Sequence, residues 1–374
     1  MNILYIRHKK ANSILFVDKI FKKINCNVKI IRLEDFISSN EDFQTYDFIF
    51  YQTWPDNNIY KETVTYDYNN LPIVKHIKVS KQELKYNNGY FNHQKFKLDK
   101  IEKSDLKFLK LNNKHKILID LFDDGDEDAY SRFLNEDYPY KSIEIKDILK
   151  SLDSNYFYNI PRIKLQPSNS YLNKFNVILE TTYFVKNLHN LNIENESAAN
   201  IPGGSVNEKG FGGKNRKYRN VEFHYNCYYW NNPIRIAIKQ AVEYINNKYQ
   251  YYVVNTKKFK NYDSELRYVF TNINAPGCGP GCIRHIESFN NGCLLLAYND
   301  IKNINIIPYC KLIDGEDYIL FNLNNFEEKI RFIINNPEKV NRIRINGHEK
   351  FKKFYNFNKI SEILLEKLKK LKIN

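Results

Sequence analysis

The chain has 374 residues, a length that suits two domains of ordinary size better than one. Hydrophobic residues make up 43% of it and aromatic residues 15%, which is enough apolar material to exclude global disorder. The net charge is +14, but the lysines are scattered along the chain, which argues against a dedicated nucleic-acid binder. A basic surface would still help to attract an anionic ligand.

We expect neither a membrane span nor a secretory signal in this sequence. No apolar run approaches the roughly 20 residues that a transmembrane helix needs. The first residues, MNILYIRHKK, turn basic after a short apolar stretch, which reverses the order of a secretory signal. We therefore expect a soluble cytoplasmic protein. Its six cysteines fit no zinc-binding spacing, and in a long chain without a secretory signal we expect them to be free thiols.

The N-terminal part reads as strands that alternate with helices. Short apolar runs at residues 2–6, 27–33, 46–52, 116–122 and 176–179 predict strands. Ser13 is a candidate N-cap for a helix whose apolar residues recur at helical spacing. Continuous apolar strands between amphipathic helices are typical of a parallel sheet with both faces covered.

A polar, glycine-rich stretch at residues 192–220 separates this part from the rest of the chain. It holds five glycines, and neither glycine pair has the spacing of a phosphate-binding motif, so it predicts a linker. We expect an N-terminal Rossmann-like domain at residues 1–205 and a C-terminal Rossmann-like domain at 206–355. A last helix at 356–374 is expected to pack back toward the N-terminal domain.

The alternation of strands and helices restarts after the linker. Strands are predicted at residues 221–225, 250–255, 267–272 and 293–297, and helices at 233–245, 283–289, 327–335 and 337–353. An amphipathic stripe from Ile360 to Leu371 predicts the last helix. The fold class is therefore α/β, with two parallel-sheet domains.

The segment richest in chemistry is a glycine-rich loop that opens the helix at 283–289. Gly279 and Gly281 allow a close approach of backbone to ligand, and the N–H groups at a helix start attract anions. Arg284 can hold phosphates with a forked contact, and Glu287 lies one turn later on the same face, where it can accept ribose hydroxyls. The pattern predicts a nucleotide-diphosphate site, with a surface ion pair as the simpler alternative.

Two further residues are candidates for binding the same ligand. Arg235 opens the helix that follows the first strand of the second domain, where it could contact donor phosphates. His224 ends that strand and is a candidate for the binding face.

An acidic loop, DDGDED, follows the strand at 116–122. Asp124 and Asp126 are the catalytic candidates, because a carboxylate there could act as general base on an acceptor hydroxyl. The loop could instead hold a divalent metal, or it could be a solvated helix start that complements the helix dipole. No EF-hand spacing is present, so a calcium site is not favoured.

Residues 267–374 carry several short motifs in a fixed order. In RHIESFNNGCLLLAYND, an arginine and a glutamate on one helix precede a Gly-Cys step and an apolar strand. A DGE turn with a short strand, an EKI helix, an NPE helix start and an NG pair before a basic helix follow. In these motifs the chain resembles GT-B glycosyltransferases, closest to the group-1 and spore-maturation-protein-like families.

The resemblance implies an enzyme that moves a sugar, of the hexosyltransferase class, from a nucleotide-diphosphate sugar to an unidentified acceptor hydroxyl. It implies two Rossmann-like domains that face each other across a cleft, with the donor on the C-terminal domain. Glu287 matches the ribose position of these families, and Arg284 matches an arginine near the phosphates. Such enzymes generally need no metal, because a helix dipole and an arginine supply the positive charge.

One position departs from the pattern of the group-1 family. Gly279 stands where many members have another glutamate, eight residues before the ribose glutamate. This departure favours an alternative, in which the chain keeps the GT-B fold without transfer activity or serves as a basic nucleotide- or nucleic-acid-binding protein.

Overall fold

The chain forms two compact units. The computed structural model describes residues 1–7, 12–52, 60–66, 72–78, 103–112, 115–121, 147, 156–193, 221–225, 233–249, 254–256, 258, 260, 262–277 and 279–373. The first unit comprises Met1–Lys61, His76–Phe184 and Asn356–Asn374, and the second comprises Glu62–Lys75 and Val185–Tyr355. The boundary expected between residues 205 and 206 lies outside the described residues.

The described residues of the first unit build a six-stranded sheet in which all neighbouring strands are parallel. In spatial order the strands are β2 (Asn27–Arg32), β1 (Asn2–Arg7), β3 (Phe48–Gln52), β6 (Lys116–Asp120), β7 (Arg162–Leu165) and β8 (Val177–Thr181). The helices are α1 (Asn12–Lys23), α2 (Leu33–Ser38), a helix at residues 103–110, α7 (Tyr156–Asn159), α8 (Asn169–Lys174) and α14 (Phe357–Ile373), with a short 3-10 turn, η1 (Phe43–Thr45). Two further strands, β4 (Tyr60–Tyr66) and β5 (Pro72–Lys78), pair with each other, and residues 62–66 and 72–75 of them belong to the second unit.

Both faces of this first sheet are covered by aromatic packing. On one face, the rings of Tyr51 and Phe108 stack with centroids 4.5 Å apart. On the other face, Phe21 of α1 contacts Tyr5 and Phe50, each at a centroid distance of 4.9 Å. Burial on both faces explains why these strands read as continuous apolar runs and not as alternating ones.

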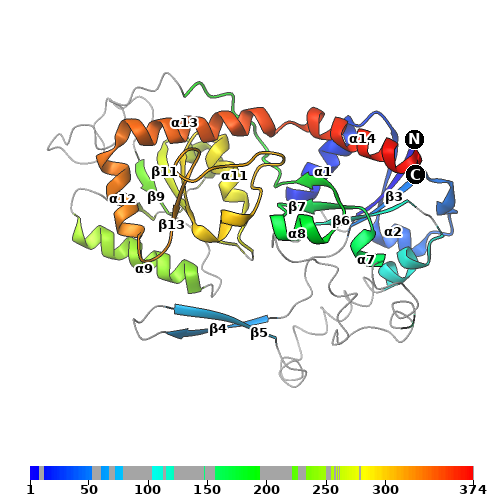
Figure 1. Ribbon diagram of the computed structural model, residues 1–374, viewed down its shortest axis with the longest axis horizontal. Coiled ribbons are helices and arrows are strands. Elements are labelled where there is room, and N and C mark those ends of the chain that lie inside the picture. Colours follow the sequence, from blue (N-terminus) through cyan, green and yellow to red (C-terminus); the bar gives the residue numbers. More distant parts are fainter. Residues whose placement is uncertain are drawn as a thin grey trace. The chain divides into compact units, whose positions relative to one another are not determined.

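The last helix, α14, lies against α1 and β8 of the first unit (Figure 1). The rings of Phe357 and Phe16 are 5.0 Å apart, and the Ser361 hydroxyl donates a hydrogen bond to the carbonyl oxygen of Ile20 at 2.9 Å. The two ends of the chain therefore belong to the same unit.

The described residues of the second unit build a five-stranded sheet, again with parallel neighbours. Its strands, in spatial order, are β10 (Val254–Asn255), β9 (Val221–His224), β11 (Val269–Asn274), β12 (Leu294–Tyr298) and β13 (Ile319–Phe321). Its helices are α9 (Pro233–Lys248), α10 (Tyr262–Leu266), α11 (Ile283–Asn290), the 3-10 turn η3 (Asn299–Asn303), α12 (Phe326–Asn335) and α13 (Pro337–Phe354).

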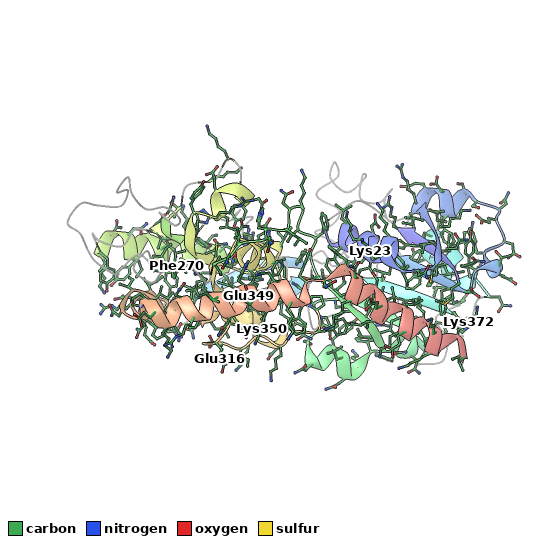
Figure 2. The ribbon with its side chains drawn as sticks, turned by 90° about the horizontal axis from the view of Figure 1, so that it is seen from above. Lys23, Phe270, Glu316, Glu349, Lys350 and Lys372 are labelled. Atoms are coloured by element: carbon green, nitrogen blue, oxygen red, sulfur yellow. The ribbon has the colours of Figure 1, made fainter. Side chains whose placement is uncertain are left out.

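The long helix α13 approaches α11 closely at Gly347. A Cβ atom on Gly347 would lie 2.3 Å from the carbonyl oxygen of Asp317 and 2.7 Å from the ring of Phe289. One turn further along α13, Lys350 pairs with the Asp317 carboxylate at 2.5 Å, and Figure 2 shows Lys350 beside the loop that carries Glu316. This close approach gives a structural role to the NG pair noted in the sequence.

Two buried side chains of α13 hold the far end of α11. Arg344 donates a hydrogen bond to the carbonyl oxygen of Gly292 at 2.8 Å and lies over the ring of Phe270 at 5.2 Å (Figure 2 labels Phe270). The Nδ1 atom of His348 lies 2.6 Å from the carbonyl oxygen of Phe289. Burial lowers the pKa of His348, so the ring is neutral near pH 7.

The expectation of two Rossmann-like α/β domains with parallel sheets is confirmed. The sequence does not predict β7, because two of its four residues, Arg162 and Lys164, are cations. Both are fully buried: Arg162 lies over the ring of Phe175 at 4.3 Å, and Lys164 pairs with Asp120 at 3.2 Å. Among the described residues, no helix combines enough length and apolar character to cross a membrane.

We expect the substitution Gly347→Ala to lower the free energy of unfolding by about 3 kcal/mol, because the added methyl group overlaps backbone and ring atoms that cannot both move away. Thermal melting of the full chain measures this loss. Arg342→Ala, at an exposed position of the same helix, is the control and should change stability by less than about 0.5 kcal/mol. Equal melting temperatures for the two variants would contradict a tight contact at Gly347.

Candidate functional site

The glycine-rich loop lies at the carboxyl end of β11, the central strand of the second sheet. This strand ends at Asn274 and α11 begins at Ile283, so the loop connects the strand to the helix start. Gly279 and Gly281 are both buried, and the Gly277 N–H group donates to the carbonyl oxygen of Gly279 at 2.8 Å. Ligands of parallel α/β sheets bind outside the carboxyl ends of the strands, so this loop is a candidate binding element.

Two arginines from different helices approach this loop. Arg235, in the first turn of α9, donates from Nε to the carbonyl oxygen of Pro276 at 2.7 Å. Arg284, in the first turn of α11, donates from Nη2 to the carbonyl oxygen of Ala275 at 3.5 Å. The sequence predicts both arginines as phosphate ligands, and the structure brings them to consecutive residues of one loop.

The first turn of α11 carries a concentrated positive potential. Cys282 is the N-cap residue, and its N–H group donates to Nδ1 of His285 at 3.1 Å. Burial by itself raises the pKa of the Cys282 thiol, but His285 and Arg284 outweigh that effect and lower the pKa to about 6. A potential that stabilises a thiolate at this place also favours the negative charge of a phosphate group.

Glu287 lies one turn further along α11 and is partly buried. Burial, with a smaller contribution from the charges of Cys282 and Asp263, raises the pKa of its carboxyl group to about 7, although Arg284 opposes this shift. A carboxyl group with few water contacts and a pKa near neutrality can accept hydrogen bonds from ligand hydroxyl groups in place of water.

A network of polar side chains fixes α11 to the strand behind it. The Asn272 amide donates to the Ser288 hydroxyl at 2.8 Å and to the Tyr262 hydroxyl at 3.1 Å. The Asn274 amide also donates to Ser288, at 3.0 Å, and Ser288 donates to the carbonyl oxygen of Arg284 at 2.6 Å. Sequence reasoning missed this network, although alternating asparagines in the apolar strand VFTNIN are its visible signal.

Of the remaining predicted residues, one lies behind the site in the sheet and two lie outside the described residues. His224 is fully buried, with Nδ1 3.2 Å from Oδ1 of Asn272, so it is linked to the site through that asparagine. A direct contact between His224 and the donor stays a prediction. Asp124 and Asp126 lie outside the described residues. Within the described part of the chain, no group of three or more His, Cys, Asp or Glu side chains is placed to hold a metal ion.

The comparisons with known proteins find similarity only among solved structures. No family model matches the chain, and no curated protein sequence matches it. Anabaena HepE in complex with UDP matches at 9% identity, with 99% of this chain and 100% of that chain covered and a TM-score of 0.48. Sucrose-phosphate synthase from Thermosynechococcus elongatus matches at 10% identity, with 99% and 98% covered and a TM-score of 0.44.

A third solved structure, that of TarM, matches at 11% identity, with 98% of each chain covered and a TM-score of 0.43. At 9% to 11% identity, the similarity to these structures is one of fold alone.

The raised pKa of Glu287 makes stability depend on pH. Below pH 4.5 the carboxyl group is protonated in both states, and as pH rises toward 7 only the unfolded chain gains a freely hydrated carboxylate. Relative to Glu287→Gln, the native chain should therefore lose up to about 3 kcal/mol of unfolding free energy between pH 4.5 and 8. Urea titrations of both proteins across this range measure the difference.

Cys282→Ser provides a matched control for this measurement. Serine places a hydroxyl oxygen at the N-cap position in place of sulfur and removes the thiolate, one of the charges that raise the Glu287 pKa. The pH-dependent loss should become smaller in this background. A stability difference that does not vary with pH would show that Glu287 titrates normally.

Proposed function

We propose that this chain is a glycosyltransferase that moves a hexose from a nucleotide-diphosphate sugar to an acceptor hydroxyl group. The observation that carries the proposal is the placement of Glu287 and Arg284 on successive turns at the start of α11. The carboxyl group is partly buried, and the arginine contacts a glycine-rich loop at the carboxyl end of a parallel sheet. Ribose hydroxyls and a diphosphate are the ligand groups that suit this pair.

The donor would bind with its ribose on Glu287 and its diphosphate on the loop. Gly279 and Gly281 offer backbone without side chains, so the phosphates can approach the first N–H groups of α11. Arg284 and Arg235, whose guanidinium groups approach the same loop, add positive charge. The ligand therefore meets donors that are already oriented, which lowers the entropic cost of binding.

The same groups would stabilise the departing diphosphate. Negative charge develops on the phosphate oxygens as the bond to the sugar breaks, and fixed cations and helix N–H groups nearby stabilise that charge. We propose that these groups take the place of a metal ion. The base that accepts the acceptor's proton is proposed to be Asp124 or Asp126, which follow β6 in the sequence.

One observation favours a second candidate function. Gly279 offers no carboxylate at the position where many group-1 enzymes carry their additional glutamate. Without that contact to the sugar, the chain would bind a nucleotide and transfer nothing. Slow hydrolysis of a nucleotide sugar by the purified chain separates the enzyme from this binding protein, and steep salt-dependent affinity for DNA or RNA would indicate a nucleic-acid binder instead.

Glu287→Ala and Arg284→Ala should each weaken the binding of UDP or GDP at least tenfold, about 1.4 kcal/mol, because each removes a charged partner of the ligand. Isothermal titration measures both affinities. Lys239→Ala, which removes an exposed cation from α9, controls for the general loss of positive charge and should bind like the native chain. Native affinity in both site variants would show that the donor site has been misplaced.

The acidic loop is tested by Asp124→Asn and Asp126→Asn, which keep side-chain shape and remove charge. If one of these carboxylates is the base, that variant should lose at least a hundredfold in kcat while its affinity for nucleotide diphosphate is unchanged. Transfer to a confirmed acceptor is the activity to measure. Native turnover in both variants would leave the loop as a helix-capping feature.

A further inference from the structure

In the first unit, two buried polar residues at the carboxyl ends of β7 and β8 are joined through their backbones. Gln166 follows β7 directly and Thr181 ends β8, and the Gln166 N–H group donates to the Thr181 carbonyl oxygen at 3.1 Å. Both residues are 0% exposed. Across the described structure, neither amide atom of the Gln166 side chain has a hydrogen-bond partner, and neither has the Thr181 hydroxyl.

Gln166 also carries backbone strain. Its φ angle is +50°, in the left-handed region that residues with a side chain adopt at a cost of about 1–2 kcal/mol. A buried amide without partners costs about 1–3 kcal/mol more. Glycine would relieve the strain and leucine or methionine would remove the unsatisfied groups, so a glutamine at this position is poorly explained by stability alone. Strained, unsatisfied polar residues concentrate at binding sites.

The charged side chains of this region already have partners. Lys164 pairs with Asp120 at 3.2 Å and lies over the ring of Tyr171 at 4.8 Å, while the Tyr171 hydroxyl donates to Asp120 at 3.0 Å. Arg162 lies over the ring of Phe175. A charged ligand would therefore have to compete with the existing pairs, whereas an uncharged one would leave them intact.

The chemistry of the two unsatisfied side chains defines the ligand class. The Gln166 amide offers one donor group and one acceptor, and the Thr181 hydroxyl offers both. These complement the hydroxyl groups of an alcohol, and two such residues on neighbouring strands suit a ligand with more than one hydroxyl group. Parallel sheets bind ligands at the carboxyl ends of their strands, where both residues lie.

We propose that Gln166 and Thr181 form a binding site for an uncharged sugar or polyol. Its use as the acceptor site rests on the proposed glycosyltransferase function, whereas recognition of hydroxyl groups rests on this unit alone. Because neither side chain is exposed, the ligand enters by a local opening and loses its hydration at these contacts. A ligand without the matching hydroxyl would leave the two groups unsatisfied, which makes the site selective.

The test uses Gln166→Met and Thr181→Val in the full chain, with glucose, galactose, N-acetylglucosamine and glycerol as probes in thermal melting. Both variants should melt at or above the native temperature, because they remove unsatisfied polar groups without removing hydrogen bonds. At least one probe should raise the melting temperature of the native chain, and at least tenfold more of it should be needed in each variant.

Gln52→Met is the matched control. Gln52 is a buried glutamine at the carboxyl end of β3 in the same sheet, and it has interaction partners, so its replacement should lower the melting temperature. A similar drop in Gln166→Met would show that the Gln166 amide supports the fold, and would overturn the proposal. Native chain that responds to none of the probes, or more strongly to glucose 6-phosphate than to glucose, would overturn it as well.

A titration with UDP and GDP separates this proposal from the proposed function. Gln166→Met and Thr181→Val should bind the nucleotide like the native chain, because Arg284 and Glu287 belong to the second unit. If no nucleotide binds while the probe response depends on Gln166, the hydroxyl site stands and the glycosyltransferase proposal fails.

Discussion

The second unit depends on the contact between α13 and α11 at Gly347, where the absence of a side chain lets the helices approach. The ring of Phe289 and the carbonyl oxygen of Asp317 occupy the space that any larger residue would need. At this separation Arg344 and His348, which flank the glycine, reach carbonyl oxygens at the end of α11. Helix packing and hydrogen bonding are thus coupled, since a wider spacing would weaken both.

The contact between α13 and α11 fixes the position of the helix that carries the candidate donor site. With its far end fixed by α13, α11 is held at its first turn by the polar network of Asn272, Asn274 and Ser288. The side chains of Arg284 and Glu287 therefore project from a helix that is anchored at both ends. Anchoring of this kind orients charged groups before the ligand binds. Such preorganisation is a main source of ligand and transition-state stabilisation in a binding or catalytic site. The raised pKa of Glu287 reflects the same enclosure.

The first unit shows how a sheet accepts cations in its interior. Arg162 and Lys164 of β7 are enclosed because an aromatic ring and the Asp120 carboxylate replace the water that they lose. The strand ends at Leu165, and the next residue, Gln166, has a left-handed backbone. Within a few residues of these paired cations, the Gln166 amide and the Thr181 hydroxyl have no hydrogen-bond partner among the described residues, so they keep hydrogen-bonding capacity for a ligand.

By itself, the sequence determined the two parallel α/β sheets, the helix that carries Arg284 and Glu287, and the two long C-terminal helices. These features follow from local patterns: apolar runs where both sheet faces are covered, and apolar stripes at helical spacing. Only the tertiary structure decided that RIKL is a strand and that Val185–Ile193 joins the second unit. It also decided the partners of Ser288 and the enclosure of Glu287, because long-range contacts set these features and leave no periodic trace in the sequence.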